Sequence, residues 1–236
     1  MSEQFPVKES YIPFKGYRTW YRIVGDSEAP GKLPLLCLHG GPGAAHDYIE
    51  PLQAMAATGR RVILYDQLGC GNSNTPPNPS MWTPELYVEE INVVRQALGL
   101  DHLHLLGQSW GGMLAMEYML TQPEGVASVT IASSPASMEQ WVSEANRLRG
   151  DMPQEVQAAL TRHEQTGDYG HPEYAAASTE FNKRHVCRVY PYPDFVQRTF
   201  DMLDFKNKPE VYNTMNGPNE FHVVGTLKHW NVIPRL

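Results

Sequence analysis

The residues best suited to chemistry are Gly107-Gln108-Ser109-Trp110-Gly111, a serine with a glycine two positions away on each side. A serine hydroxyl is a weak nucleophile at neutral pH. It must therefore stand clear of the backbone, beside a base and close to amide donors for the developing oxyanion. A sharp turn between a strand and a helix achieves this, and glycines flank such a turn because side chains would collide across it. Ser109 is the candidate nucleophile.

The segments on either side of Ser109 fit such a turn. Residues 102–106 form a short apolar run typical of a buried strand, and residues 110–120 carry the spacing of a buried helix. In serine hydrolases built this way, the amide after the nucleophile donates to the oxyanion. Trp110 N–H is therefore predicted as one oxyanion donor.

A second glycine-rich segment, His39-Gly40-Gly41-Pro42-Gly43, follows an apolar strand predicted over residues 33–38. Glycines let the backbone approach a substrate closely with outward amides, and Pro42 stiffens the loop. Gly41 N–H is the predicted second oxyanion donor, because that donor comes from the loop after the third strand. His39 precedes the serine in the chain, so we interpret it as a residue that orders this loop rather than as the base.

The remaining elements predict an α/β sheet. The expected elements are a hairpin of strands at 11–14 and 17–24, helices at 45–57 and 83–99, and strands at 61–65 and 126–132. Strands and helices alternate from residue 33 onward, which specifies a mostly parallel sheet with ligands beyond the carboxyl ends of its strands. Asp66, at such an end, is expected to order the loop that follows it.

The pattern changes after the sixth strand. From Ala136 through Gly217 the apolar residues recur at helical spacing, and no segment has the pattern of a buried strand. We therefore predict an α/β core over residues 1–135, a helical cap over 136–225 that shapes the substrate pocket, and the start of a return to the core over 226–236.

Composition restricts the class of partner. The 236 residues are 42% hydrophobic and 19% charged, which excludes a disordered or fibrous chain. The formal net charge of −7 and the lack of a basic run argue against nucleic acid or an anionic membrane. A small-molecule or peptide partner fits better. The sequence indicates no metal and no cofactor, and it leaves the oligomeric state open.

The cysteines and the N-terminal residues bear on the compartment. Cys37, Cys70 and Cys187 form neither a disulfide framework nor a Cys-x-x-Cys pair, so reduced structural thiols are expected. The first residues lack the charged and apolar regions of a signal peptide, and no apolar run approaches the roughly 18 residues that span a bilayer. The sequence therefore predicts a cytoplasmic protein.

Four segments in combination resemble the proline iminopeptidase family, serine peptidases with the α/β-hydrolase fold. They are His39-Gly40-Gly41-Pro42-Gly43, Tyr65-Asp66-Gln67-Leu68-Gly69-Cys70-Gly71-Asn72-Ser73, Gly107-Gln108-Ser109-Trp110-Gly111-Gly112 and Met215-Asn216-Gly217-Pro218-Asn219-Glu220-Phe221. They are distributed over nearly the whole chain. The first and last are more specific to the family than the serine turn.

The resemblance implies release of an N-terminal residue, often proline, from short peptides through a seryl acyl-enzyme. It implies Ser109 as nucleophile with the Gly41 and Trp110 amides as oxyanion donors. It also implies that Glu220 receives the free α-amino group of the substrate, since an aminopeptidase must hold a cation at a fixed distance from the scissile carbonyl. The family's second amine-binding carboxylate is expected beyond residue 236.

The resemblance also requires an acid and a histidine, which in this fold follow the serine on loops after strands seven and eight. We expect the chain to end before both, about 60 residues short of the complete fold, and strand six to be an unpaired sheet edge. The variant position for the acid, after strand six, holds Ser133-Ser134-Pro135. The histidines after Ser109 fall in the predicted cap or just after it, at His163, His171, His185, His222 and His229.

Three functions therefore stay open at this point. The first is a serine aminopeptidase acting on short peptides, and the second is an amidase or esterase on the same scaffold, acting for example on an amino-acid amide. The third is a catalytically inactive binding or assembly remnant. The variant Glu220→Gln would separate the first function from the second. A loss of activity confined to substrates with a free amine supports the peptidase, and unchanged activity favours the amidase or esterase.

Overall fold

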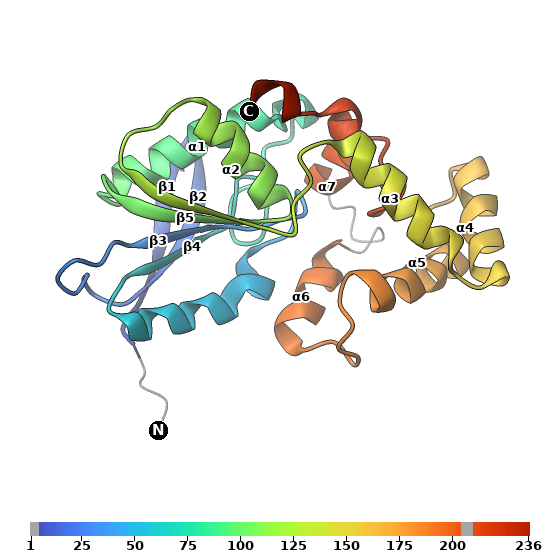
Figure 1. Ribbon diagram of the computed structural model, residues 1–236, viewed down its shortest axis with the longest axis horizontal. Coiled ribbons are helices and arrows are strands. Elements are labelled where there is room, and N and C mark those ends of the chain that lie inside the picture. The colour runs from blue at the N-terminus through green and yellow to red at the C-terminus, as the bar shows by residue number, and fades with distance from the viewer. Residues whose placement is uncertain (1–4, 204–209) are drawn as a thin grey trace.

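The computed structural model describes residues 5–203 and 210–236. A six-stranded sheet lies beside a group of helices that covers one end of it (Figure 1). The strands are β1 Val7–Phe14, β2 Tyr17–Val24, β3 Leu35–Leu38, β4 Val62–Tyr65, β5 Leu103–Gln108 and β6 Val126–Ala132. The fold is that of an α/β hydrolase, with a mixed sheet.

The order of strands in the sheet is β1-β2-β4-β3-β5-β6. β1 and β2 form the predicted antiparallel hairpin, and β2 is also antiparallel to β4. β3 pairs in parallel with β4 and β5, and β5 pairs in parallel with β6. The carboxyl ends of β3, β4 and β5 therefore meet at one edge, where the two glycine-rich segments begin.

Alternate residues of the central strands face two different layers. Leu36 and Leu105 pack with the helices α1 Pro84–Ala97 and α2 Trp110–Leu120 on one face. Cys37 and Leu64 pack on the other face against η1 His46–Thr58. Because successive side chains of a strand point to opposite faces, a strand buried on both sides reads as an uninterrupted apolar run.

Most predicted elements are confirmed, with differences at their ends. α1 begins after Thr83, whose side chain accepts from Leu86 N, and Pro84 is its first residue. β1 begins at Val7, earlier than predicted, while β3 and β4 begin at Leu35 and Val62, one or two residues later than predicted.

The predicted α-helix after the first glycine loop is wrong in type. Residues 46–58 form a 3₁₀ helix that contains Pro51 and ends at Gly59, which is in the left-handed region. Proline lacks the N–H that a regular α-helix needs at an interior position, which accounts for the departure. Met55, one of the apolar residues at helical spacing in this segment, is 40% exposed.

Helices follow β6, as predicted. They are α3 Met138–Gly150, α4 Gln154–Thr166, α5 Pro172–His185, α6 Asp194–Leu203 and α7 Glu210–Met215, with short 3₁₀ turns η4 Thr226–His229 and η5 Ile233–Arg235 near the C-terminus and η2 Pro79–Met81 earlier in the chain. α3, α4 and α5 share a hydrophobic cluster of their own that includes Leu160, Phe181 and Phe221. The cap boundaries at 136 and 225 remain a prediction.

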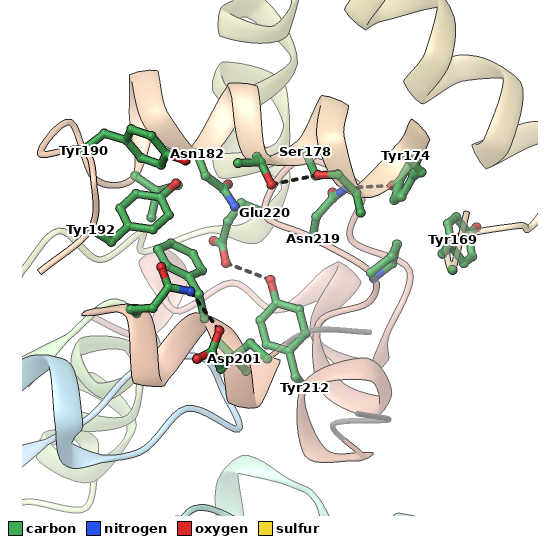
Figure 2. Close-up of a pocket in the computed structure, with 18 residues that line it drawn as sticks. Tyr169, Tyr174, Ser178, Asn182, Tyr190, Tyr192, Asp201, Tyr212, Asn219 and Glu220 are labelled. Atoms are coloured by element: carbon green, nitrogen blue, oxygen red, sulfur yellow. Dashed lines mark hydrogen bonds between the residues drawn. The ribbon is translucent and has the colours of Figure 1, made fainter. Parts of the chain in front are cut away.

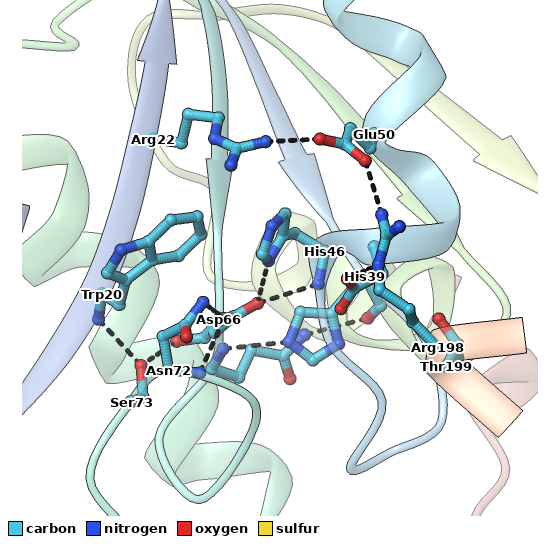
Figure 3. Close-up of polar contacts among 12 residues, drawn as sticks. Trp20, Arg22, His39, His46, Glu50, Asp66, Asn72, Ser73, Arg198 and Thr199 are labelled. Atoms are coloured by element: carbon cyan, nitrogen blue, oxygen red, sulfur yellow. Dashed lines mark hydrogen bonds and ion pairs between the residues drawn. The ribbon is translucent and has the colours of Figure 1, made fainter. Parts of the chain in front are cut away.

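Arg198 of α6 ties this helical part to the core. Its guanidinium donates to Asp47 Oδ1 at 2.7 Å and to Glu50 Oε2 at 2.8 Å on η1 (Figure 3). Arg22 of β2 donates to the other oxygen of Glu50 at 2.7 Å. Sheet, η1 and α6 are therefore joined by one charged network.

β6 is the last strand of the described sheet, with a partner, β5, on one side only. This confirms the predicted sheet edge, and the Ile131 side chain on it is 42% exposed. In the two described ranges, none of the helices combines the length and the apolar character that crossing a bilayer requires.

Candidate active site

Ser109 lies at the turn between β5 and α2, as predicted. Its φ of 54° and ψ of −123° lie outside the regions that side chains favour. Ser109 N donates to Ala132 O at 2.9 Å, and Gly112 N donates to Ser109 O at 2.9 Å. The backbone is thus held in a strained conformation from both sides, and the partly exposed serine side chain stands out from the turn.

The glycines around Ser109 are explained by close contacts. A Cβ at Gly107 would collide with Gly111 O across the turn, and one at Gly111 would collide with Leu38 O of β3. Because both obstacles are backbone atoms, no side-chain movement could relieve them. These contacts let α2 approach the sheet closely enough to bring Ser109 beside the loop that follows β3.

That loop lies directly against the serine. A Cβ at Gly40 would be 3.0 Å from Ser109 Cβ and 2.9 Å from the Tyr48 hydroxyl. Gly41 has a φ of +111°, and a Cβ there would be 2.5 Å from Ala44 N. Only glycine fits this tight, left-handed turn, which lies beside Ser109.

Ser109, Gly41 and Trp110 line one pocket. Its other lining residues are Pro42, Met113, Pro135, Met138, Trp141, Asn216, Glu220 and Leu227. Trp110 is the first residue of α2, so its N–H has no acceptor within the helix. The structure thus brings the four predicted site residues, Ser109, Gly41, Trp110 and Glu220, to one place.

Two polar side chains that were not predicted connect the glycine loop and the serine turn. Gln67 Nε2 donates to His39 O at 2.9 Å, while Gln67 Oε1 accepts from the Trp110 indole at 2.8 Å. The Tyr48 hydroxyl accepts from Gly40 N at 2.6 Å and donates to Gln108 Oε1 at 2.5 Å. Each side chain therefore connects the glycine loop to the serine turn.

His39 and Asp66 order loops, as interpreted from the sequence. Gln67 N donates to His39 Nε2 at 2.9 Å, so the proton of the neutral ring is on Nδ1, which lies 2.9 Å from Gly40 O. Burial lowers the His39 pKa, which favours this neutral form. His39 is fully buried and cannot serve as the base.

The Asp66 carboxylate binds two loops at once (Figure 3). Oδ1 accepts from His46 N and lies 2.8 Å from His46 Nδ1, and Oδ2 accepts from Asn72 N at 2.9 Å. Burial acts to raise the Asp66 pKa, but the hydrogen bonds and the two nearby histidines outweigh it and hold the pKa below its usual range.

Glu220 lies between the serine pocket and a larger cavity of about 340 Å³ in the helical part. Figure 2 shows its carboxylate and the Tyr212 hydroxyl pointing toward each other, and Tyr212 donates to Glu220 Oε1 at 2.8 Å. Burial raises the pKa of Glu220, and the hydrogen bond from Tyr212 opposes this only in part. This carboxylate gains from a cationic partner.

The backbone of Glu220 is fixed by its neighbours. Trp141 Nε1 donates to Glu220 O at 2.8 Å, and Asn219 Nδ2 donates to the Tyr174 hydroxyl at 2.6 Å. A Cβ at Gly43 would be 2.7 Å from Tyr212 N, so α7 rests on the glycine loop. The distance between Glu220 and the oxyanion loop is therefore set by packed elements.

The predicted histidines do not reach Ser109. His163 lies 2.9 Å from Glu173 Oε2, His222 lies 3.2 Å from the Tyr169 hydroxyl, and His185 packs on Phe181. Within residues 5–203 and 210–236, neither a histidine nor an aspartate lines the serine pocket. The described part of the pocket therefore holds the Ser109 hydroxyl, the Gly41 and Trp110 backbone and the Glu220 carboxylate, but no histidine.

A further histidine cluster has the spacing of a metal site. His163, His171 and Glu173 lie between α4 and α5 rather than at Ser109, and in the described part of the chain they alone form such a group. His163 and His171 are eight residues apart in a segment whose pattern is that of helices, so the sequence indicated no metal site.

Comparisons with known proteins place the chain in a family. Residues 34–210 match the model of the α/β hydrolase fold. A proline iminopeptidase of Levilactobacillus brevis is 42% identical over 234 residues, which cover 98% of this chain and 76% of the relative. The chain belongs to the proline iminopeptidase family of α/β hydrolases. This membership explains why the four segments of the sequence resemble that family.

Solved structures agree with this membership. The crystal structure of proline iminopeptidase from Mycobacterium smegmatis is 48% identical with a TM-score of 0.86, covering 97% of this chain and 77% of that one. The crystal structure of VinJ is 42% identical with a TM-score of 0.92 over the same shares. Both likenesses extend through the helical part as well as the sheet.

Proposed function

We propose that this chain carries the site of a serine aminopeptidase that releases the N-terminal residue, proline above all, from short peptides. The observation that carries the proposal is that Ser109, its two amide donors and Glu220 line one pocket, in a chain 42% to 48% identical to proline iminopeptidases over almost its whole length. These relatives do not favour an amidase, an esterase or an inactive remnant.

In the proposed reaction, Ser109 Oγ attacks the carbonyl carbon of the first peptide bond. The carbonyl oxygen becomes an oxyanion that accepts hydrogen bonds from Gly41 N–H and Trp110 N–H. The C–N bond then breaks, the shortened peptide leaves as an amine, and the aminoacyl group remains as an ester on Ser109. Water hydrolyses this ester and restores the hydroxyl.

Glu220 selects the substrate. Its largely desolvated carboxylate sits beside the serine pocket, so a free α-ammonium group of the peptide restores the interaction that burial removed. An amine held there fixes the distance to the scissile carbonyl, which restricts cleavage to the first bond. A peptide without a free amino terminus lacks this contact.

The proton of Ser109 needs an acceptor, and no described residue of the pocket is a histidine. Ser109 is partly exposed, and we propose that a small added base can approach its hydroxyl. The assay is therefore run with and without added imidazole, which can take the serine proton and return it to the leaving amine.

The first test measures p-nitroaniline release from proline p-nitroanilide by the protein and by Ser109→Ala. With imidazole present, we expect the substitution to abolish the imidazole-dependent turnover, since the acyl-enzyme cannot form. Turnover that survives Ser109→Ala would reject the mechanism. Ser134→Ala, a change near the turn that removes no proposed catalytic group, is the matched control.

The second test measures binding of prolinamide to Ser109→Ala and to the double variant with Glu220→Gln. Loss of a charge-assisted contact of about 1.5–3 kcal/mol corresponds to roughly 10- to 100-fold weaker binding. N-acetylprolinamide, which has no cationic amine, should bind the two proteins equally. Equal binding of prolinamide to both would show that Glu220 does not anchor the amine.

The substrate partner is thus a short peptide, and the cytoplasm is the proposed compartment. Cys37, Cys70 and Cys187 are free thiols in the structure, which suits a reducing compartment. Fractionation of the producing cells, followed by immunodetection of the protein, tests the location.

A further inference from the structure

The connection between α4 and α5 holds a compact cluster of imidazoles and carboxylates. His163 is in the last turn of α4, His171 caps α5, and Glu173 is in the first turn of α5. One ligand atom from each of these three residues lies within 4.8 Å of the other two. The three side chains are close together both in the sequence and in space. The proposed peptidase chemistry does not use them.

Both ring nitrogens of the buried His163 face carboxylates. Nε2 lies 2.9 Å from Glu173 Oε2, and Nδ1 lies 3.8 Å from Asp168 Oδ2. A neutral imidazole carries a proton on one nitrogen and a lone pair on the other. A lone pair turned toward a carboxylate is repelled unless a proton or a cation lies between them.

His163 Nε2 is within hydrogen-bond distance of Glu173 Oε2, whereas Nδ1 and Asp168 Oδ2, 3.8 Å apart, are not. Without an ion, Nε2–H therefore donates to Glu173. A metal ion between these two atoms would take the place of that proton, and the ring would then carry its proton on Nδ1, on the side of the Asp168 carboxylate. His163 and Glu173 are thus placed to be ligands of one ion.

His171 supplies the third candidate ligand. Its ring stacks on that of His163, with centroids 4.2 Å apart and an angle of 20° between the planes. The lone pairs of parallel rings do not converge, so the His171 ring must tilt to reach a shared ion. The side chain is exposed, and the contact that it gives up is the hydrogen bond that Nδ1 accepts from Glu173 N at 3.1 Å.

Arg162 is the competitor for Glu173. Its guanidinium donates to both carboxylate oxygens, at 2.9 and 3.1 Å, but its side chain is 60% exposed. An exposed ion pair of this kind contributes little to stability and is easily exchanged. A divalent cation can displace it, after which Arg162 returns to water.

We propose that His163, His171 and Glu173 bind a zinc ion, with a water molecule as the fourth ligand. Two imidazoles and one carboxylate form a donor set that suits Zn²⁺, which prefers ligands at about 2.0–2.2 Å in a tetrahedral arrangement. In that geometry the ligand atoms are about 3.4 Å apart. The observed separations, from 2.9 Å to at most 4.8 Å, bracket this value.

A zinc ion here has a structural consequence for the substrate cavity. It joins the end of α4 to the start of α5, and α5 provides Tyr174, Ser178 and Asn182 to the cavity wall. Tyr174 follows Glu173 directly and accepts the hydrogen bond from Asn219, the residue before Glu220. The ion would therefore steady the wall that carries Glu220.

The test is titration of the untagged, chelator-treated protein with ZnCl₂ by calorimetry, and with CoCl₂ by visible absorption, which reports the ligands of cobalt. We expect one saturable site, a rise in the midpoint of thermal unfolding with zinc, and at least about tenfold weaker binding in both His171→Ala and Glu173→Gln. Both substituted residues are exposed, so these variants should fold, and circular dichroism checks this. His102→Ala, which removes an exposed histidine of the core, should bind zinc like the unchanged protein.

The proposal is overturned if the unchanged protein shows no saturable zinc binding, or if either His171→Ala or Glu173→Gln binds zinc with unaltered affinity. Because the readout is metal binding and not hydrolysis, this outcome leaves the proposed peptidase function untouched.

Discussion

At the scale of single residues, Tyr48 and Gln67 matter as much as the groups that contact substrate. Gln67 is fully buried and Tyr48 half-buried, and each bonds to both the glycine loop and the serine turn. Oxyanion stabilisation depends on donors that are already in place before the charge develops. We therefore regard both as positioning residues.

Tyr48→Phe tests this role. The change removes the acceptor of Gly40 N and leaves that amide unsatisfied, which costs about 1–3 kcal/mol. We expect the kcat for proline p-nitroanilide to fall about tenfold with little change in KM, because the loop amides lose their alignment rather than their contact with the amine. Tyr11→Phe, on the exposed strand β1, is the control, and an equal kcat in both variants would contradict the role.

At the scale of elements, the approach of α2 to β3 places Ser109, the proposed nucleophile, and glycine makes this approach possible. Gly111→Ala puts a methyl group against Leu38 O, a backbone atom. We expect a loss of about 3 kcal/mol or more in the free energy of unfolding measured in urea. Gly150→Ala, at the end of α3 with no atom within 4 Å of the new methyl, should instead stabilise by about 0.5 kcal/mol. Similar unfolding midpoints for the two variants would show that the close contact of Gly111 with Leu38 O does not determine stability.

At the scale of the whole molecule, a buried carboxyl makes stability depend on pH. Glu90 of α1 is fully buried, accepts from Thr19 Oγ1 at 2.5 Å and from Leu68 N at 3.0 Å, and joins α1 to β2 and to the loop after β4. Burial raises its pKa to about 8. The folded protein therefore holds this proton more tightly than the unfolded chain does.

Protonated Glu90 therefore makes its full contribution to stability below the ordinary carboxyl pKa of about 4.5. This contribution is lost as the pH rises to about 8, the pKa of Glu90 in the folded protein. We expect the free energy of unfolding, measured in urea, to fall between pH 5 and pH 8 by an amount on the order of a few kcal/mol. Glu90→Gln, which resembles the protonated acid, should flatten this slope, whereas Glu89→Gln on the exposed side of α1 should not. Equal slopes for Glu90→Gln and the unchanged protein would refute the assignment.

Features that depend on neighbouring residues could be predicted from the sequence, whereas contacts between distant residues could not. The uninterrupted apolar runs of the central strands and the glycine-flanked serine turn are local patterns, so the sheet and the positions of Ser109, Gly41 and Trp110 could be predicted. The contacts of Gln67 with Trp110 and of Tyr48 with Gln108 join residues 43 and 60 positions apart, and no local pattern encodes them. The 3₁₀ form of η1 was missed because its apolar spacing resembles that of an α-helix.

Covalent labelling of the protein by a fluorophosphonate, with the adduct located by mass spectrometry, most directly tests whether Ser109 is the nucleophile. We predict a single adduct on Ser109, formed faster when imidazole is present, unchanged in Ser134→Ala and abolished in Ser109→Ala. An adduct on another serine, or equal labelling of Ser109→Ala, would contradict the assignment of this residue as the catalytic serine.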